Sequence, residues 1–108
     1  RGKGNDWLIL NSIDGNFIDL IEISTHHFKG NYPSYCSLQA AYLPPKSSNQ
    51  IVNSSNKWKY LLKNTKLSAN KTHKFKNYLM KKDKINHIKI NIFPDGGISR
   101  FRIFGKKI

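Results

Sequence analysis

Apolar and polar residues alternate with a period of two along most of this chain, which is the pattern of β-strands. The alternation is clearest in Cys36–Tyr42, Ile88–Phe93 and Arg100–Phe104. Further strands are predicted at Asp6–Leu10, Phe17–Ser24, Trp58–Leu62 and His73–Leu79. The pattern therefore predicts six or seven short strands and no helix.

Turn signals separate these strands. Asp14–Asn16 predicts a turn between the first two strands, because Asp, Gly and Asn favour tight turns. The apolar phase changes between Leu20 and Ile21, which predicts a bulge or burial on both faces of that strand. Lys46–Asn56 is rich in Ser and Asn without periodicity and is predicted to be a surface loop, and Lys63–Lys71 to be irregular chain.

The last two predicted strands are connected through Pro94–Gly97, whose glycines tolerate the positive φ of hairpin turns. We therefore predict a hairpin with one face on the core, carrying Ile88, Ile90, Ile92, Phe101 and Ile103. The other face would carry Lys89, Asn91, Arg100 and Arg102. Two neighbouring guanidinium groups at Arg100 and Arg102 can bind one carboxylate, although an ordinary solvated sheet face is the alternative interpretation.

The chain of 108 residues has room for one domain, and short strands without helices favour a β-sandwich, of jelly-roll type. No apolar run reaches the roughly 20 residues of a membrane span, and the first residues contain no apolar leader. The single cysteine, Cys36, lies on the apolar side of its strand and is predicted to be a buried small hydrophobe. One unpaired cysteine favours a reducing compartment, so we expect a cytoplasmic protein.

The formal net charge is +13, which raises the question of nucleic-acid binding. Sixteen of the 19 basic residues are lysines spread along the chain, whereas sequence-reading proteins rely on the bidentate fork of arginine. We interpret the charge as a solvated, lysine-biased surface. Nucleic acid is therefore not the expected partner.

The segment Ser24–Pro33 leaves a strand and enters a loop, where sites commonly lie on a rigid scaffold. It contains His26 and His27, which point to opposite faces if the chain is extended, so one metal ion would not bind both. An imidazole titrates near neutral pH, so His27 is a candidate general acid or base, with a structural role in the loop as the alternative. The sequence contains no metal-ligand spacing, phosphate loop or nucleophile elbow, so we predict no metal and no cofactor.

Two long segments resemble the signature of the allantoicase repeat family. The first is Thr25–Pro33, with its His-His-Phe-Lys-Gly-Asn-Tyr-Pro run, followed by Cys36–Ala41. The second is Asn91–Gly105, with Phe-Pro-Asp-Gly-Gly followed by Ser-Arg-Phe-Arg-Ile. Shorter similarities lie near Trp7, at Trp58–Leu62 and at His73–Phe75, in the order of the family. The resemblance covers most of residues 1–108, as a single repeat. The loop sequence is more similar to the second repeat of the family than to the first.

This resemblance implies a jelly-roll sandwich similar to galactose-binding domains. It also implies hydrolysis of allantoate to ureidoglycolate and urea. Family members usually carry two repeats, so another copy of the chain or a second repeat would complete the site. The family usually has Asp immediately before the Thr of this motif, whereas this sequence has Ser24.

Together with the chemistry of allantoate, the resemblance implies a set of site residues. Arg100 and Arg102 would bind the carboxylate, and Asn31 with Gln39 would hydrogen-bond the ureido groups. His27 and Asp95 would transfer protons, and Lys29 would stabilise developing negative charge. The alternative function is a non-catalytic jelly-roll module that binds a small polar ligand or a carbohydrate.

Overall fold

A computed structural model describes residues 6–27, 30, 32–76, 85–94 and 96–107, and only the backbone path of 12–19 and 105–107. Within these residues the chain forms six strands and one helix. They are β1 (Asp6–Ser24), β2 (Tyr35–Ala41), α1 (Ser48–Ser55), β3 (Lys59–Lys66), β4 (Thr72–Phe75), β5 (Ile85–Phe93) and β6 (Arg100–Lys107). All strand pairings are antiparallel.

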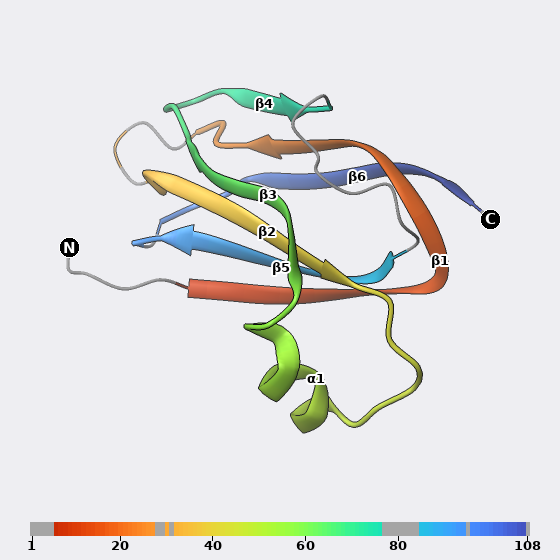
Figure 1. The fold of residues 1–108 in the computed structure, drawn as a ribbon. Helices are drawn as coiled ribbons and strands as arrows, with labels where there is room; N and C mark the ends of the chain where they lie inside the picture. Colours follow the sequence, from red (N-terminus) through yellow and green to blue (C-terminus); the bar gives the residue numbers. More distant parts are fainter. Residues whose placement is uncertain (1–5, 28–29, 31, 77–84, 95, 108) are drawn as a thin grey trace.

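The long strand β1 belongs to two sheets. Its first half pairs with β5, and β5 continues to β2 and β3, which gives a first sheet in the order β3-β2-β5-β1. Its second half lies between β4 and β6 and forms a second sheet. Figure 1 shows β1 curving from one layer into the other. The predicted all-β sandwich is therefore confirmed: two antiparallel sheets joined by one shared strand.

Where the sequence predicts a tight turn at Asp14–Asn16, the chain instead bends while remaining in strand conformation. The register of β1 against β5 is interrupted between Asn11 and Asn16, where β1 passes from one sheet to the other. A second irregularity between Ile18 and Leu20 agrees with the predicted bulge, because one residue of β1 has no counterpart on β6.

The core lies between the sheets. Ile21 and Ile23 come from the second sheet and are fully buried, while Leu38 and Ile90 come from the first. Burial of such side chains contributes about 1.5–3 kcal/mol each and is the main force that holds the layers together. Five residues of the last two strands were predicted to face the core. For Ile103 this prediction is wrong, because the residue is 37% exposed.

The predicted hairpin between the last two strands is also wrong. β5 pairs with β1 and β2, whereas β6 pairs with β1 in the other sheet. The connection after Phe93 therefore crosses between layers. It is held there because the Ser99 N–H donates to the carbonyl of Ser24 on β1 at 2.8 Å and Ile98 packs against the core.

The central strands of the first sheet, β2 and β5, are buried on both faces, which the alternation alone did not predict. Lys89 and Asn91 were expected on a solvent face but are only 8% and 6% exposed. The Asn91 amide donates to Gln39 Oε1 at 3.1 Å, and Lys89 Nζ donates to Ser55 Oγ at 2.9 Å. These polar side chains can be buried because each finds a hydrogen-bond partner.

The predicted surface loop at Lys46–Asn56 contains the helix α1. Ser47 caps its N-terminus: the Gln50 N–H donates to Ser47 Oγ at 3.2 Å, and the Gln50 side chain accepts from the Ser47 N–H at 3.0 Å. The Ser-x-x-Gln spacing was the signal for this helix, and the lack of an apolar stripe concealed it. No helix in the described part of the chain is long and apolar enough to cross a membrane.

Other boundaries differ from the predicted ones in detail. β3 continues through Lys66, into the stretch predicted to be irregular. β4 ends at Phe75, and the predicted strand residues 77–79 lie outside the described part of the chain. Tyr42, predicted to continue the apolar face of β2, follows the end of that strand and is 53% exposed.

Cys36 is fully buried on β2, as predicted, and burial raises the pKa of its thiol to about 12. The thiol therefore stays protonated in the folded protein at neutral pH, and the thiolate is the reactive form. We expect a thiol reagent such as Ellman's reagent to leave the native chain unmodified and to modify it completely in denaturant. Rapid modification of the native chain would contradict the observed burial.

Candidate functional site

Three connections meet at one end of the sandwich. The Ser34 N–H, before β2, donates to the carbonyl of Phe93 at 2.9 Å, and the Ser99 N–H, before β6, donates to that of Ser24 at 2.8 Å. The Leu67 N–H, after β3, donates to the Ser34 carbonyl at 2.9 Å. The two loops that resemble the family signature are therefore neighbours in space, at the left of Figure 1.

Thr25 anchors the β3–β4 connection to the end of β1. Its side chain is fully buried, and its hydroxyl donates to the Ser68 carbonyl at 2.6 Å and accepts from the Lys71 N–H at 3.1 Å. The Thr25 N–H donates to the Lys71 carbonyl at 2.7 Å. One side chain thus connects two of the three loops.

His27 has a left-handed backbone conformation, with φ at 73°. Its N–H donates to the Asn70 side-chain oxygen at 3.0 Å, and Asn70 itself has φ at 48°. Positive φ is uncommon for residues other than glycine and is often found where a binding site constrains the backbone. His27 is exposed at this end of the molecule.

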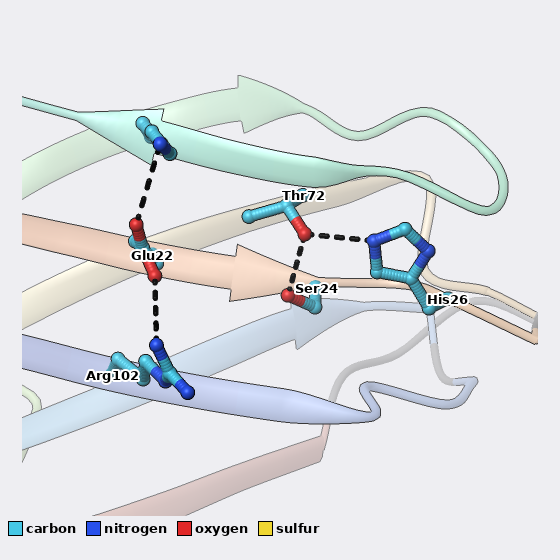
Figure 2. A network of polar contacts seen from close by, with 6 residues as sticks. Glu22, Ser24, His26, Thr72 and Arg102 are labelled. Carbon is cyan, nitrogen blue, oxygen red and sulfur yellow. Dashed lines mark hydrogen bonds and ion pairs between the residues drawn. The ribbon is translucent and has the colours of Figure 1, made fainter.

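The outer face of the second sheet carries a set of polar side chains that we call the polar face: Glu22, Ser24, His26, Thr72, Lys74, Arg100 and Arg102. Opposite Glu22 lie Arg102 on β6 and Lys74 on β4. The Glu22 carboxylate is 3.9 Å from Arg102, an ion pair drawn as a dashed line in Figure 2, and 3.7 Å from Lys74. The glutamate is 14% exposed, so it is held between two cations close to the surface.

A chain of hydrogen bonds continues along the polar face toward the loops. Ser24 Oγ lies 3.0 Å from Thr72 Oγ1, and His26 Nε2 lies 2.9 Å from the same Thr72 oxygen (Figure 2). The hydroxyl of Thr72 therefore connects the serine to the imidazole. Each of these groups can donate or accept a hydrogen bond, and the imidazole is the one of the three that titrates near neutral pH.

The charge of the polar face is suited to an anion. Arg100 pairs in register with Ser24, and Arg102 with Glu22, so the two arginines lie on the same face of β6. With Lys74 they bring three positive charges to one described carboxylate. Among the described side chains, no three of His, Cys, Asp and Glu gather closely enough to hold a metal ion.

A cavity of about 440 Å³ lies at the same end, along the open edge between the two sheets. Its walls are mainly apolar and come from β1, β5 and the connection that follows β5, with Asp6 and Arg100 as its charged lining residues. Arg100 therefore belongs both to the polar face and to this cavity. A ligand bound at the arginines would have space beside it at this edge.

The structure brings together some of the predicted site residues and separates others. Arg100 and Arg102 share a face, and His27 lies in the adjoining loop. Gln39 lies on the first sheet, 3% exposed, and its amide group is bonded to the carbonyls of Asn56 and Trp58 and to Asn91. Its role as a ureido ligand stays a prediction, as do those of three residues outside the described part of the chain: Lys29, Asn31 and Asp95.

Sequence reasoning did not single out Glu22 and chose His27 over His26. A signal for Glu22 was available, because it is a charged residue between Ile21 and Ile23 in an otherwise apolar stretch. His26 could not be distinguished from His27 by residue type. The conformation of His27 and the hydrogen bond of His26 to Thr72 distinguish the two.

Comparison with known proteins supports the resemblance seen in the sequence. The allantoicase repeat family matches residues 1–108. The chain is 44% identical over 108 residues to a probable allantoicase of Stutzerimonas stutzeri strain A1501, and 44% over 106 residues to one of Acinetobacter baumannii strain AYE. It superposes on the crystal structure of allantoicase from Saccharomyces cerevisiae with a TM-score of 0.76 and 26% identity, over 95% of this chain and 28% of that one.

These matches cover 100% and 98% of this chain but only 33% and 32% of the bacterial proteins, so the chain spans about a third of the length of these curated relatives. The fold agrees as well, since the two-sheet sandwich is the architecture shared with the yeast protein. The family match extends over the whole chain, including both loops at the polar face and the strand that carries the arginines. The chain therefore belongs to the allantoicase repeat family.

Proposed function

We propose that this protein takes part in the hydrolysis of allantoate to ureidoglycolate and urea. The observation that supports this most is the polar face, where Arg102 lies beside Glu22 and Arg100 lies opposite Ser24, near the end of the sandwich where the loops meet. Allantoate carries one carboxylate and two ureido groups on a single carbon. A cationic face with a nearby acid is the environment that such a substrate needs.

In this proposal the arginines bind the substrate carboxylate. Guanidinium groups form bidentate, charge-assisted hydrogen bonds with carboxylates, and such bonds are stronger than neutral ones. The Arg102 side chain is half-exposed, so a ligand can reach its guanidinium group while the group lies 3.9 Å from Glu22. Lys74 can retain Glu22 when Arg102 turns to the ligand, because the carboxylate already contacts both.

Hydrolysis breaks the bond between the central carbon and one ureido nitrogen, and water adds its oxygen to that carbon. The leaving nitrogen needs a proton, and the attacking water must lose one. We propose His27 and Asp95 for these transfers, with Glu22 and the His26–Thr72 pair as further candidates on the polar face. Lys29 and Asn31 would stabilise negative charge and bind the ureido group.

Urea release from allantoate by the purified chain, with ureidoglycolate followed in parallel, tests this proposal. We expect turnover that falls about 100-fold in His27→Ala, since groups that transfer protons typically contribute 10²–10⁴-fold. Calorimetry with allantoate separates binding from turnover in the same samples. Binding without turnover would contradict catalysis by this chain and support a non-catalytic binding module.

The oligomeric state bears on the same question, because the chain spans about a third of the length of its curated relatives. We propose that a second copy of this chain, or a second repeat, completes the site. Light scattering coupled to size exclusion measures the mass in solution. If the measured mass is that of one chain and the same sample releases urea from allantoate, one copy is sufficient for the reaction and the proposal of a shared site is wrong.

A further inference from the structure

His73 on β4 makes two hydrogen bonds to the backbone, one from each nitrogen of its ring. Its Nδ1 lies 3.0 Å from the carbonyl oxygen of Ile23 on β1, and its Nε2 lies 2.8 Å from the backbone nitrogen of Ser68, in the β3–β4 loop (residues 67–71). A carbonyl oxygen can only accept and a backbone N–H can only donate. The two partners therefore require the neutral imidazole with its proton on Nδ1.

A protonated ring cannot make both bonds, because an imidazolium carries a proton on each nitrogen. Its Nδ1 would still donate to Ile23, whereas its Nε2 would place a second donor 2.8 Å from the Ser68 nitrogen. Protonation of His73 thus removes the bond to Ser68 alone. Imidazole is the ordinary side chain that changes charge between pH 5 and 8, so a modest fall in pH is sufficient for this change.

The β3–β4 loop has two other anchors. The Leu67 N–H donates to the Ser34 carbonyl at 2.9 Å, and the Thr25 hydroxyl donates to the Ser68 carbonyl at 2.6 Å. Backbone groups and a threonine hydroxyl do not titrate near neutral pH. Among the described contacts that anchor this loop, the bond to His73 is the one that depends on protonation.

The same loop holds the backbone of His27. Asn70 Oδ1 accepts from the His27 N–H at 3.0 Å, and the two residues have φ at 48° and 73°. Positive φ is unfavourable for residues other than glycine, so it persists only while the surrounding contacts maintain it. Release of the loop at Ser68 therefore weakens the contact that fixes His27.

The His73 ring lies on the inner side of β4, stacked on Phe75 at 6.4 Å between centroids and opposite Ile23 in register. Lys71, the charged residue of the loop, is exposed. The charged side chains of the polar face are on the other side of β1, β4 and β6, because successive side chains of a strand alternate: Glu22, Lys74, Arg100 and Arg102. In the part of the chain that the structure describes, His73 forms no ion pair, so its backbone partners decide which form fits.

We propose that His73 is a positioning residue that makes substrate binding at the polar face depend on pH. Neutral His73 holds the β3–β4 loop and, through Asn70, the backbone of His27. Protonation frees the loop, so the affinity for allantoate falls as the pH is lowered from about 7.5 to about 5.5. Added positive charge on His26 or His27 would by itself change the affinity for an anion in the opposite direction. The choice of ligand rests on the proposed function, whereas the loop device rests on the hydrogen bonds alone.

Nitrogen-15 NMR of the native chain tests the device without a ligand. At about pH 7.5 we expect a His73 ring with a protonated Nδ1 and a bare Nε2. As the pH is lowered to about 5.5, the amide resonances of Ser68 and Asn70 should move in step with protonation of His73. If the Ser68 resonance stayed in place while His73 took up a proton, the inference would be wrong.

Two variants assign this response to His73. His73→Gln keeps one donor and one acceptor but does not titrate, so the Ser68 amide resonance should no longer move with pH. His26→Gln removes the imidazole beside Thr72, and the movement should persist. A Ser68 response that survived in His73→Gln and vanished in His26→Gln would overturn the inference.

Calorimetry with allantoate at the same pH values measures the effect on the site. Between the higher and the lower pH, the native chain should lose about three- to tenfold more affinity than His73→Gln, the range expected for one hydrogen bond. Identical pH profiles in the two proteins would contradict a positioning role. If neither protein bound allantoate at the higher pH while the Ser68 resonance titrated as expected, the proposed function would be wrong and the loop device would still be supported.

Discussion

Replacement of Arg102 by Met should weaken allantoate binding about 10- to 100-fold while the fold persists. A charge-assisted hydrogen bond to a carboxylate contributes about 1.5–3 kcal/mol, and each 1.4 kcal/mol corresponds to a factor of ten. The carboxylate is bound both before and during the reaction, so the KM for urea release should rise with little change in kcat. Calorimetry and a urea-release assay measure the two effects.

Two further variants make this expectation specific. Arg102→Lys retains the charge but not the planar fork, and we expect an intermediate loss. Lys66→Met removes an exposed charge at the end of β3, on the other sheet, and should have no effect on binding. The Arg102–Glu22 pair is exposed on the arginine side, so its loss should change the free energy of unfolding by less than about 1 kcal/mol. Equal losses in Arg102→Met and Lys66→Met would show that overall charge, not Arg102, attracts the substrate.

Thr25→Val should lower the free energy of unfolding by about 2 kcal/mol. Valine has nearly the shape of threonine, but it leaves the Ser68 carbonyl and the Lys71 N–H without the hydroxyl that they contact at 2.6 and 3.1 Å. Unpaired groups at partly buried positions cost about 1–3 kcal/mol. For a domain of this size that corresponds to a decrease in Tm of roughly 10 °C, measurable by thermal or chemical denaturation.

Thr65→Val is the matched control for this variant. The Thr65 hydroxyl donates to the Lys63 carbonyl two residues away in β3, at an exposed position, so its loss should cost less than about 0.5 kcal/mol. Because Thr25 positions the loops beside the polar face, Thr25→Val should also weaken allantoate binding. A stable Thr25→Val variant with normal binding would show that the contacts around Thr25 do not hold the loops.

The strand pattern was read well from the sequence because alternation is a local property. Cys36, Leu38 and Ala40 are buried on one side of β2 as their spacing predicts. The helix α1 and the crossing of β5 to β6 were missed. The helix is stabilised by its capping box and not by an apolar stripe. The crossing from β5 to β6 depends on which strand lies nearest in space.

The candidate site was predictable in its residue types and partly in its geometry. Arg100 and Arg102 were expected on one face, and their register opposite Ser24 and Glu22 places them there. The expectation that Lys89 and Asn91 would share that face was wrong, since they belong to the other sheet. The family resemblance identified the loops, but it could not tell which imidazole points along the polar face.

Residue order and periodicity were enough to identify the β-strand architecture, the family, the buried cysteine and the two loops that carry the signature. These follow from local periodicity and from residue order, which need no knowledge of distant contacts. The folded structure was needed to show that β1 belongs to both sheets, that Glu22 faces Arg102, and that the loops are neighbours. Strand pairing joins residues that are far apart in the chain. The alternation within one strand shows which face is buried, but it does not show which other strand will pair with it.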